Sequence, residues 1–199
     1  LDCAFGAAHR IAPEVFRRAG ASVIAANCVD DGLSINKNCG AVYPQNLARK
    51  VLRYKADMGF AFDGDADRLI AVDEHGEVID GDMILCALAK YFDANGKLPC
   101  RTAVGTSHTN MAIEDDLKAN GISLVRTDIG DKYVLAKLLE KGYSLGGEQS
   151  GHIILKDYAT TGDGILTAIA LTNMLISEKK TLAEGVKIRL YPQENKNVP

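Results

Sequence analysis

Short runs of apolar residues alternate along this chain with longer segments whose apolar residues recur at helical spacing, and this alternation is the strongest constraint on the fold. Strands are expected at residues 22–26, 57–62, 69–72, 78–79, 102–104, 124–125, 143–145 and 152–155, and helices at 11–19, 44–52, 82–92, 111–119, 132–141 and 164–177. Strands that alternate with helices predict an α/β fold, here two consecutive α/β domains with mixed, largely parallel sheets. In the second predicted helix, Leu47, Val51 and Leu52 are expected to form the buried face.

One predicted hairpin interrupts the alternation. Turn-forming residues at 73–77 separate two apolar segments, which indicates antiparallel strands joined by a tight turn. We expect the domain boundary here, with a first domain over residues 1–78, a second over 79–188, and residues 189–199 as a linker towards a further domain. The sequence begins with neither an initiator Met nor a basic signal segment, so we expect it to be the interior of a longer chain.

Charge and composition argue against several classes of protein. The net charge is −3 and no stripe of Lys or Arg is present, so no nucleic-acid partner is expected. No apolar run approaches the roughly 18–20 residues of a membrane span, so no membrane partner is expected either. The five cysteines contain no Cys-x-x-Cys pair and are not interleaved with His. This pattern favours reduced thiols in a cytoplasmic protein over a disulfide framework or a zinc site.

An acidic loop carries the most specific chemical signal. Asp63, Asp65 and Asp67 alternate with the small residues Gly64 and Ala66 directly after an apolar strand. Loops at strand ends are where α/β proteins bind ligands, and small spacers allow the backbone to curl so that the carboxylates converge. Oxygen donors suit Mg²⁺, and without a cation three neighbouring carboxylates would repel one another. The three Asp residues are therefore predicted to bind Mg²⁺.

Three other interpretations of this acidic loop compete with the magnesium site. A solvated turn, in which the Asp residues act as caps, remains open. An EF-hand would need Gly where Arg68 stands, and helices rather than strands on both sides. A haloacid-dehalogenase phosphatase would need a small hydroxyl or apolar residue in place of Asp67. Arg68 is expected either to form an internal ion pair with the carboxylates or to bind a phosphate that the metal also touches.

A second loop, residues 146–152, combines glycines with polar side chains. Glu148, Gln149, Ser150 and His152 supply the hydrogen-bond donors and acceptors that a polyol needs. The glycines permit close approach of a ligand to the backbone. We interpret this loop as a candidate sugar site, with a polar surface turn as the alternative.

Taken in order, these motifs resemble those of one family, the α-D-phosphohexomutases. Residues 63–68 look like the metal-binding loop of that family, and residues 147–152 look like its sugar-binding loop. Gln149 is typical of the bacterial phosphoglucosamine mutase branch, where phosphomannomutase/phosphoglucomutases usually have Met. The resemblance to this branch extends over essentially the whole chain and includes residues 31–36, 39–40, 125–127, 130–134 and 161–164.

The resemblance implies a fragment of a four-domain enzyme. Members carry a phosphoserine loop in the first domain, the metal loop in the second, the sugar loop in the third and a phosphate-binding loop in the fourth. This chain is similar to the second and third domains, so its expected partners are a sugar phosphate and the missing domains 1 and 4 of its own chain. The implied reaction interconverts glucosamine 6-phosphate and glucosamine 1-phosphate through a phosphoserine enzyme and a 1,6-bisphosphate. Without the other two domains, we expect this chain to be inactive.

The resemblance also implies roles for individual residues. Mg²⁺ would be held by Asp63, Asp65 and Asp67; the catalytic residues would be Arg68, Lys132 and His152; and the substrate would be bound by Gly147, Glu148 and Ser150. Lys132 stands where this branch commonly has Arg, so the position keeps its charge and loses the bidentate fork. The near-neutral pKa of a histidine suits His152 to proton transfer, with a purely structural His152 as the alternative.

Two other functions stay open at this stage. A phosphomannomutase/phosphoglucomutase would share both loops, and a non-catalytic module that binds Mg²⁺ or a sugar phosphate would share them without the phosphoserine. Ser107 and His108 are similar to part of the family's phosphoserine loop, but they stand downstream of the metal loop. We therefore expect a strand-to-helix turn there, with a helix cap near Thr109 or Asn110.

Overall fold

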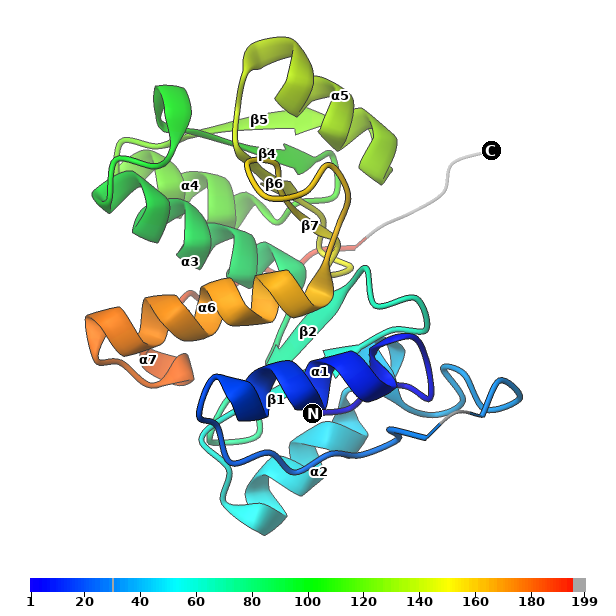
Figure 1. Cartoon of the computed structure of the whole chain (residues 1–199). Helices are drawn as coiled ribbons and strands as arrows, with labels where there is room; N and C mark the ends of the chain where they lie inside the picture. The colour runs from blue at the N-terminus through cyan, green and yellow to red at the C-terminus, as the bar shows by residue number, and fades with distance from the viewer. Residues whose placement is uncertain (30, 195–199) are drawn as a thin grey trace.

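The computed structural model describes residues 1–29 and 31–194, which form two layered α/β units. The elements up to the hairpin are α1 (Ala8–Arg18), η1 (Gly40–Val42), α2 (Gln45–Tyr54), β1 (Gly59–Phe62), β2 (Leu69–Val72) and β3 (Val78–Ile79). Those that follow are α3 (Gly81–Ala94), η2 (Pro99–Arg101), β4 (Thr102–Thr106), α4 (Met111–Ala119), β5 (Ser123–Thr127), α5 (Asp131–Lys141), β6 (Leu145–Gly147), β7 (Ile153–Leu155), α6 (Gly164–Glu178) and α7 (Leu182–Gly185). In Figure 1, α6 runs between the two units.

The two sheets differ in strand direction. The first has the order β1-β2-β3 with both pairs antiparallel, and the second has the order β5-β4-β6-β7. In the second sheet, β4 is parallel to β5 and to β6, whereas β6 and β7 are antiparallel because a short loop joins them directly. The expected hairpin forms between β2 and β3, where Asp73 Oδ1 accepts hydrogen bonds from the amides of His75 and Glu77. The two-unit α/β fold with mixed sheets is confirmed, but the sheets are less parallel than expected, because the strands of the first sheet are joined by short loops and pair antiparallel.

Each sheet lies between helices. Leu47 and Val51 of α2 pack against one face of the first sheet, while α1 and α6 cover the other face, where the Phe16 and Phe60 rings lie 5.6 Å apart between centroids. In the second sheet, Val134 and Leu138 of α5 cover one face, while α3 and α4 cover the other. A sheet covered on both faces has fully buried strands, as the burial of β1, β2 and β4 shows.

Several local expectations were wrong. Residues 22–26 form no named strand, although Ala26 is bridged to Asp2 and both Ile24 and Ala26 share backbone hydrogen bonds with Leu1. Leu52 is 54% exposed although it was expected on the buried face of its helix. The short helix α7 was not expected, although Thr181 and Glu184 form a complete capping box at its start.

The turn after β4 and the end of the chain meet at one residue. Asn110 caps α4 by accepting a hydrogen bond from the Ala112 amide, as expected for a strand-to-helix turn. Its side chain also bonds the backbone of Tyr191, at 3.1 Å to the amide and 2.9 Å to the carbonyl. The expected linker at 189–199 is thus attached to α4 at Tyr191, while its residues 195–199 lie outside the described part. None of the helices in the described residues has both the length and the apolar character that a membrane crossing requires.

One apolar core runs through both units. It includes Phe62 and Leu69 from the first sheet and Leu88, Leu145 and Leu171 from the elements that follow the hairpin, all fully buried. Helix α6 joins the two parts, since it contacts β1 and β2 of the first sheet as well as α3 and β7. The two units therefore share buried surface and are expected to unfold together.

Replacement of a core residue in α6 tests this coupling. Leu171→Ala should lower the free energy of unfolding by about 2–5 kcal/mol, because it removes a fully buried side chain and leaves a cavity. The control Ile176→Ala, on the exposed side of the same helix, should change it by no more than about 0.5 kcal/mol. Denaturant unfolding followed by circular dichroism should show a single transition in each case. Two separated transitions in Leu171→Ala would show that the units fold independently.

Candidate active site

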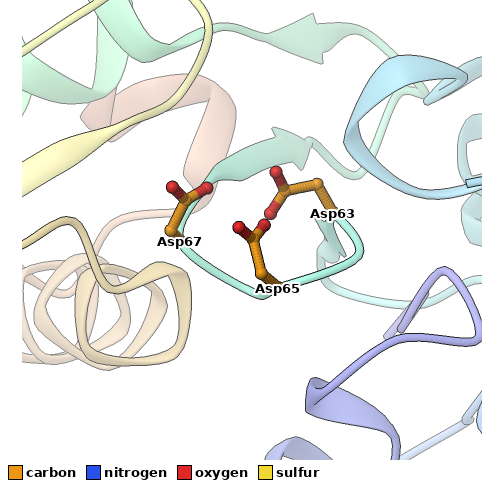
Figure 2. A group of neighbouring side chains, drawn as sticks. All are labelled: Asp63, Asp65 and Asp67. Carbon is orange, nitrogen blue, oxygen red and sulfur yellow. The ribbon is translucent and has the colours of Figure 1, made fainter. Parts of the chain in front are cut away.

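The acidic loop between β1 and β2 brings its three carboxylates together. Figure 2 shows the side chains of Asp63, Asp65 and Asp67 directed towards a common space above the loop, and one oxygen of each lies within 4.8 Å of the others. Ala66 adopts a left-handed conformation with φ of +64°, which closes the turn. The predicted convergence of the carboxylates is therefore present, since the loop folds back between two antiparallel strands.

The negative charge of this cluster is only partly balanced by neighbouring side chains, which favours a bound cation. Burial raises the pKa of Asp63 to about 6, and the neighbouring carboxylates of Asp67 and Asp65 add to the rise. Arg68 offsets part of this charge, with its Nε 3.2 Å from Asp63 Oδ2 and 3.6 Å from Asp67 Oδ1. Asp67 Oδ1 is buried and accepts no hydrogen bond from the described residues. Three oxygen donors, one of them buried without a hydrogen bond, fit a hard divalent cation.

His152 lies against the acidic loop rather than in open solvent. Its side chain is 7% exposed, with Nδ1 3.2 Å from Asp67 Oδ2, while Nε2 accepts a hydrogen bond of 3.1 Å from the Gly162 amide. A neutral imidazole that accepts a hydrogen bond at Nε2 carries its proton on Nδ1, and that N–H donates a hydrogen bond to the carboxylate. In this arrangement, both ring nitrogens are engaged, and His152 orients Asp67.

The second predicted loop lies directly beside the first. The Leu69 amide donates a hydrogen bond of 3.0 Å to the Gly151 carbonyl, and Arg68 and His152 form an antiparallel bridge. At the far end of the junction, the Gly164 amide at the start of α6 donates to the Ala66 carbonyl at 2.9 Å. The structure thus joins the acidic loop, the polar loop and the first turn of α6.

The remaining predicted residues occupy different positions in this arrangement. Glu148 Oε1 accepts a hydrogen bond of 2.9 Å from the amide of Gly130, which connects the polar loop to the start of α5. Lys132, in the first turn of α5, places Nζ 4.8 Å from the centre of the Tyr133 ring. Gly147 is buried at the end of β6, and Ser150 is exposed at the tip of the loop. Glu148 and Ser150 thus belong to the loop that contacts the acidic loop, and Lys132 lies two residues after the Gly130 amide that Glu148 binds.

Sequence reasoning missed the residues that hold the two loops together. A Cβ at Gly81 would collide with the Glu148 carbonyl oxygen, and one at Gly162 would lie 2.5 Å from His152 Nε2. Gln149 Nε2 donates to Asp80 Oδ2 at 3.2 Å, next to the hydrogen bond from the Gly81 amide to the Gln149 carbonyl. Gln149 and Gly162 stand in motifs that the sequence singles out, but neither motif nor the excess of glycine says which backbones approach each other.

Comparison with known proteins identifies the family. Residues 1–76 match the family described as "Phosphoglucomutase/phosphomannomutase, alpha/beta/alpha domain II", and residues 80–191 match "Phosphoglucomutase/phosphomannomutase, alpha/beta/alpha domain III". This chain belongs to the phosphoglucomutase/phosphomannomutase family. The acidic loop lies in the domain II match, and the polar loop lies in the domain III match.

Curated relatives resemble the chain over nearly its whole length. It is 53% identical to the phosphoglucosamine mutase of Caldicellulosiruptor saccharolyticus over 97% of this chain and 43% of that protein. It is 50% identical to the phosphoglucosamine mutase of Dictyoglomus turgidum over 100% of this chain and 44% of that protein. The chain therefore spans less than half the length of the relatives that it matches.

Solved structures share the fold. A phosphoglucomutase/phosphomannomutase family protein from Burkholderia thailandensis superposes with a TM-score of 0.84 at 28% identity, covering 92% of this chain and 41% of that one. N-acetylphosphoglucosamine mutase of Aspergillus fumigatus, solved with GlcNAc-6P and magnesium, has a TM-score of 0.72 at 22% identity, covering 92% of this chain and 44% of that one. The second comparison supports the fold alone.

The close approach at Gly151 can be tested by substitution. Gly151 has φ of +94°, and a Cβ there would collide with the backbone carbonyl of Leu69. Gly96 has φ of +67° but no atom within 4 Å of the corresponding Cβ. Gly96→Ala should therefore cost only the backbone strain, about 1 kcal/mol, whereas Gly151→Ala should cost at least about 2 kcal/mol more, because the two loops must separate. Chemical denaturation measures both values, and equal losses would contradict the packed junction.

Proposed function

We propose that this chain is the central part of a phosphoglucosamine mutase, which interconverts glucosamine 6-phosphate and glucosamine 1-phosphate. The observation that carries the proposal is the direct contact between the acidic loop and the polar loop, through Leu69–Gly151 and Asp67–His152. A reaction that moves a phosphoryl group on a sugar needs charge neutralisation and sugar recognition side by side. Identity of about 50% to proteins named phosphoglucosamine mutase supports this choice of substrate.

The division of the chain follows from the same proposal. Residues 1–78 would form the domain that carries the metal loop, residues 79–188 the domain that carries the sugar loop, and residues 189–199 a linker. The separate family matches over 1–76 and 80–191 support a boundary in this region. The parts of the relatives that this chain does not span would supply the phosphoserine and a further phosphate-binding loop.

The acidic loop would hold Mg²⁺ through Asp63, Asp65 and Asp67. A bound divalent cation supplies positive charge that stabilises the oxygens of a phosphoryl group during transfer. Arg68 adds a guanidinium beside these carboxylates, and its side chain is 44% exposed. In this proposal it keeps its ion pair with Asp63 and directs its remaining N–H groups to a phosphate.

His152 and Lys132 would support the transfer in different ways. His152 holds Asp67 through Nδ1. If the Gly162 amide moved away from Nε2, that nitrogen could accept a proton from the substrate. Lys132 is exposed in the first turn of α5, where its ammonium would meet a phosphate or a sugar hydroxyl. We assign His152 to the positioning of Asp67 and to proton transfer, and Lys132 to binding the negative charge of the substrate phosphate.

The polar loop would bind the sugar. Glu148 retains one carboxylate oxygen beyond its hydrogen bond with Gly130, Ser150 presents an exposed hydroxyl, and the buried Gly147 permits close approach. Sugar hydroxyls recognised by such groups can be bound with either end of the hexose towards the acidic loop. Recognition in both orientations suits an enzyme whose 1,6-bisphosphate intermediate must turn around.

Loss of a metal-loop carboxylate should strongly slow turnover. The test uses a chimaera in which this chain replaces the matching segment of the Dictyoglomus turgidum phosphoglucosamine mutase, since the alignment covers the whole of this chain. The assay measures formation of glucosamine 1-phosphate. Asp65→Asn should lower kcat by about 100-fold or more, since charge neutralisation is among the largest contributions to phosphoryl transfer. Asp157→Asn, which also removes an exposed carboxylate, should leave kcat unchanged. Full activity of Asp65→Asn would remove the metal assignment.

Substrate choice is tested at the polar loop. In the same chimaera, Glu148→Ala should lower kcat/KM for glucosamine 6-phosphate by about tenfold to a hundredfold. The substitution removes a hydrogen bond between the carboxylate and a sugar hydroxyl, which is worth roughly 1.5–3 kcal/mol. Mg²⁺ dependence should stay the same, since Glu148 is not part of the acidic cluster. A panel that includes mannose and glucose phosphates separates the alternative: preference for these would indicate a phosphomannomutase/phosphoglucomutase. Unchanged kinetics in Glu148→Ala would show that this loop does not bind the sugar.

A further inference from the structure

Two cysteines that are distant in sequence meet next to the first sheet. The Cys3 amide donates a hydrogen bond of 3.1 Å to the Ala26 carbonyl, and the Cys28 thiol donates one of 3.0 Å to the same oxygen. Further along both segments, the Phe5 amide donates to the Asn27 carbonyl at 2.8 Å, so the two segments are held side by side. Cys28 also packs against the apolar cluster that contains Cys3.

The two thiols differ in exposure and in acidity. Cys3 is fully buried and Cys28 is partly exposed, and both are free thiols. The hydrogen bond between the two side chains lowers the pKa of Cys28 to about 7 and raises that of Cys3. A partly exposed thiol with a lowered pKa is the reactive member of such a pair, and its side chain is hydrogen-bonded to that of the buried thiol.

The cysteine pair lies close to residues 35–36, which pack against the acidic loop. Downstream of Cys28, the Asn36 amide donates to the Ala4 carbonyl at 3.0 Å. A Cβ at Gly64, in the acidic loop, would collide with the side chains of Ile35 and Asn36. Cys3 is the neighbour of Ala4, which bonds Asn36, so a covalent link between Cys3 and Cys28 would form next to residues that pack against the acidic loop.

We propose that Cys3 and Cys28 form a reversible redox pair, in which Cys28 reacts with a peroxide and Cys3 then closes a disulfide. The Cys28 thiolate attacks one oxygen of hydrogen peroxide, the O–O bond breaks, and a sulfenic acid and hydroxide form. The Cys3 sulfur then attacks the sulfenic sulfur and displaces its hydroxyl group, which leaves with the Cys3 proton as water. In sum, two thiols are oxidised to one disulfide, and one hydrogen peroxide is reduced to two water molecules. This inference is independent of the proposed mutase activity.

Mass spectrometry of the chain tests the proposal. The chain is treated with stoichiometric hydrogen peroxide, free thiols are blocked with N-ethylmaleimide, and proteolytic peptides are mapped. We expect a peptide pair linked through Cys3 and Cys28 that dithiothreitol separates. In Cys3→Ala, no link should form, and Cys28 should be recovered as a sulfenic acid trapped by dimedone. Labelling of Cys28 by iodoacetamide at pH 7 should also slow about tenfold in this variant, because the hydrogen bond that favours its thiolate is gone.

The exposed Cys100 provides the matched control. Cys100→Ser should leave the link between Cys3 and Cys28 unchanged, because Cys100 lies in η2. Oxidation of Cys100 while Cys28 remains a thiol would overturn the proposal. Recovery of Cys28 in the wild-type chain as a sulfenic or sulfinic acid, with Cys3 still reduced, would overturn it as well. The linked peptides are measured in the unaltered chain, so the result does not depend on how well a variant folds.

Discussion

The backbone contact between residues 68–69 and residues 151–152 is the constraint on which the rest of the site depends. The Leu69 amide donates to the Gly151 carbonyl, and the Arg68–His152 bridge continues the pairing into the acidic loop. The same loop is held from a third side by the Gly164 amide at the start of α6. Since these hydrogen bonds are directional and largely buried, the two loops fix each other only when both units are folded.

The junction relies on the absence of side chains. At Gly81, Gly151, Gly162 and Gly164, a Cβ would collide with backbone or with the His152 ring. Beneath it, the apolar core passes without interruption from the first sheet through α6 to α3, so the contact rests on a packed layer. A rigid layer below a set of backbone hydrogen bonds is what allows charged and polar side chains above it to hold one geometry.

Charge at the site acts against folding and in favour of binding. Ionising Asp63 in its buried position is unfavourable, as the rise of its pKa to about 6 indicates, and Asp65 and Asp67 add repulsion. Arg68 and His152 offset part of this charge from the two loops, yet Asp67 Oδ1 keeps no hydrogen-bond partner in the described residues. Charge left uncompensated in this way favours a divalent cation, because binding one relieves the repulsion that folding created.

The sequence by itself determined the α/β class, most helices, the hairpin after Val72 and the convergence of Asp63, Asp65 and Asp67, because periodicity, turn residues and the spacing along one loop are local properties. It also pointed to Glu148 and His152 as polar groups in a glycine-rich loop. Only the tertiary structure decided that His152 holds Asp67, that Gly130 bonds Glu148, that α6 covers the first sheet and that residues 22–26 pair with the start of the chain without forming a named strand. These contacts join positions far apart in the chain, and several are made by backbone amides and carbonyls. Since nearly every residue carries those same backbone groups, no side-chain pattern in the sequence could reveal which of them would pair.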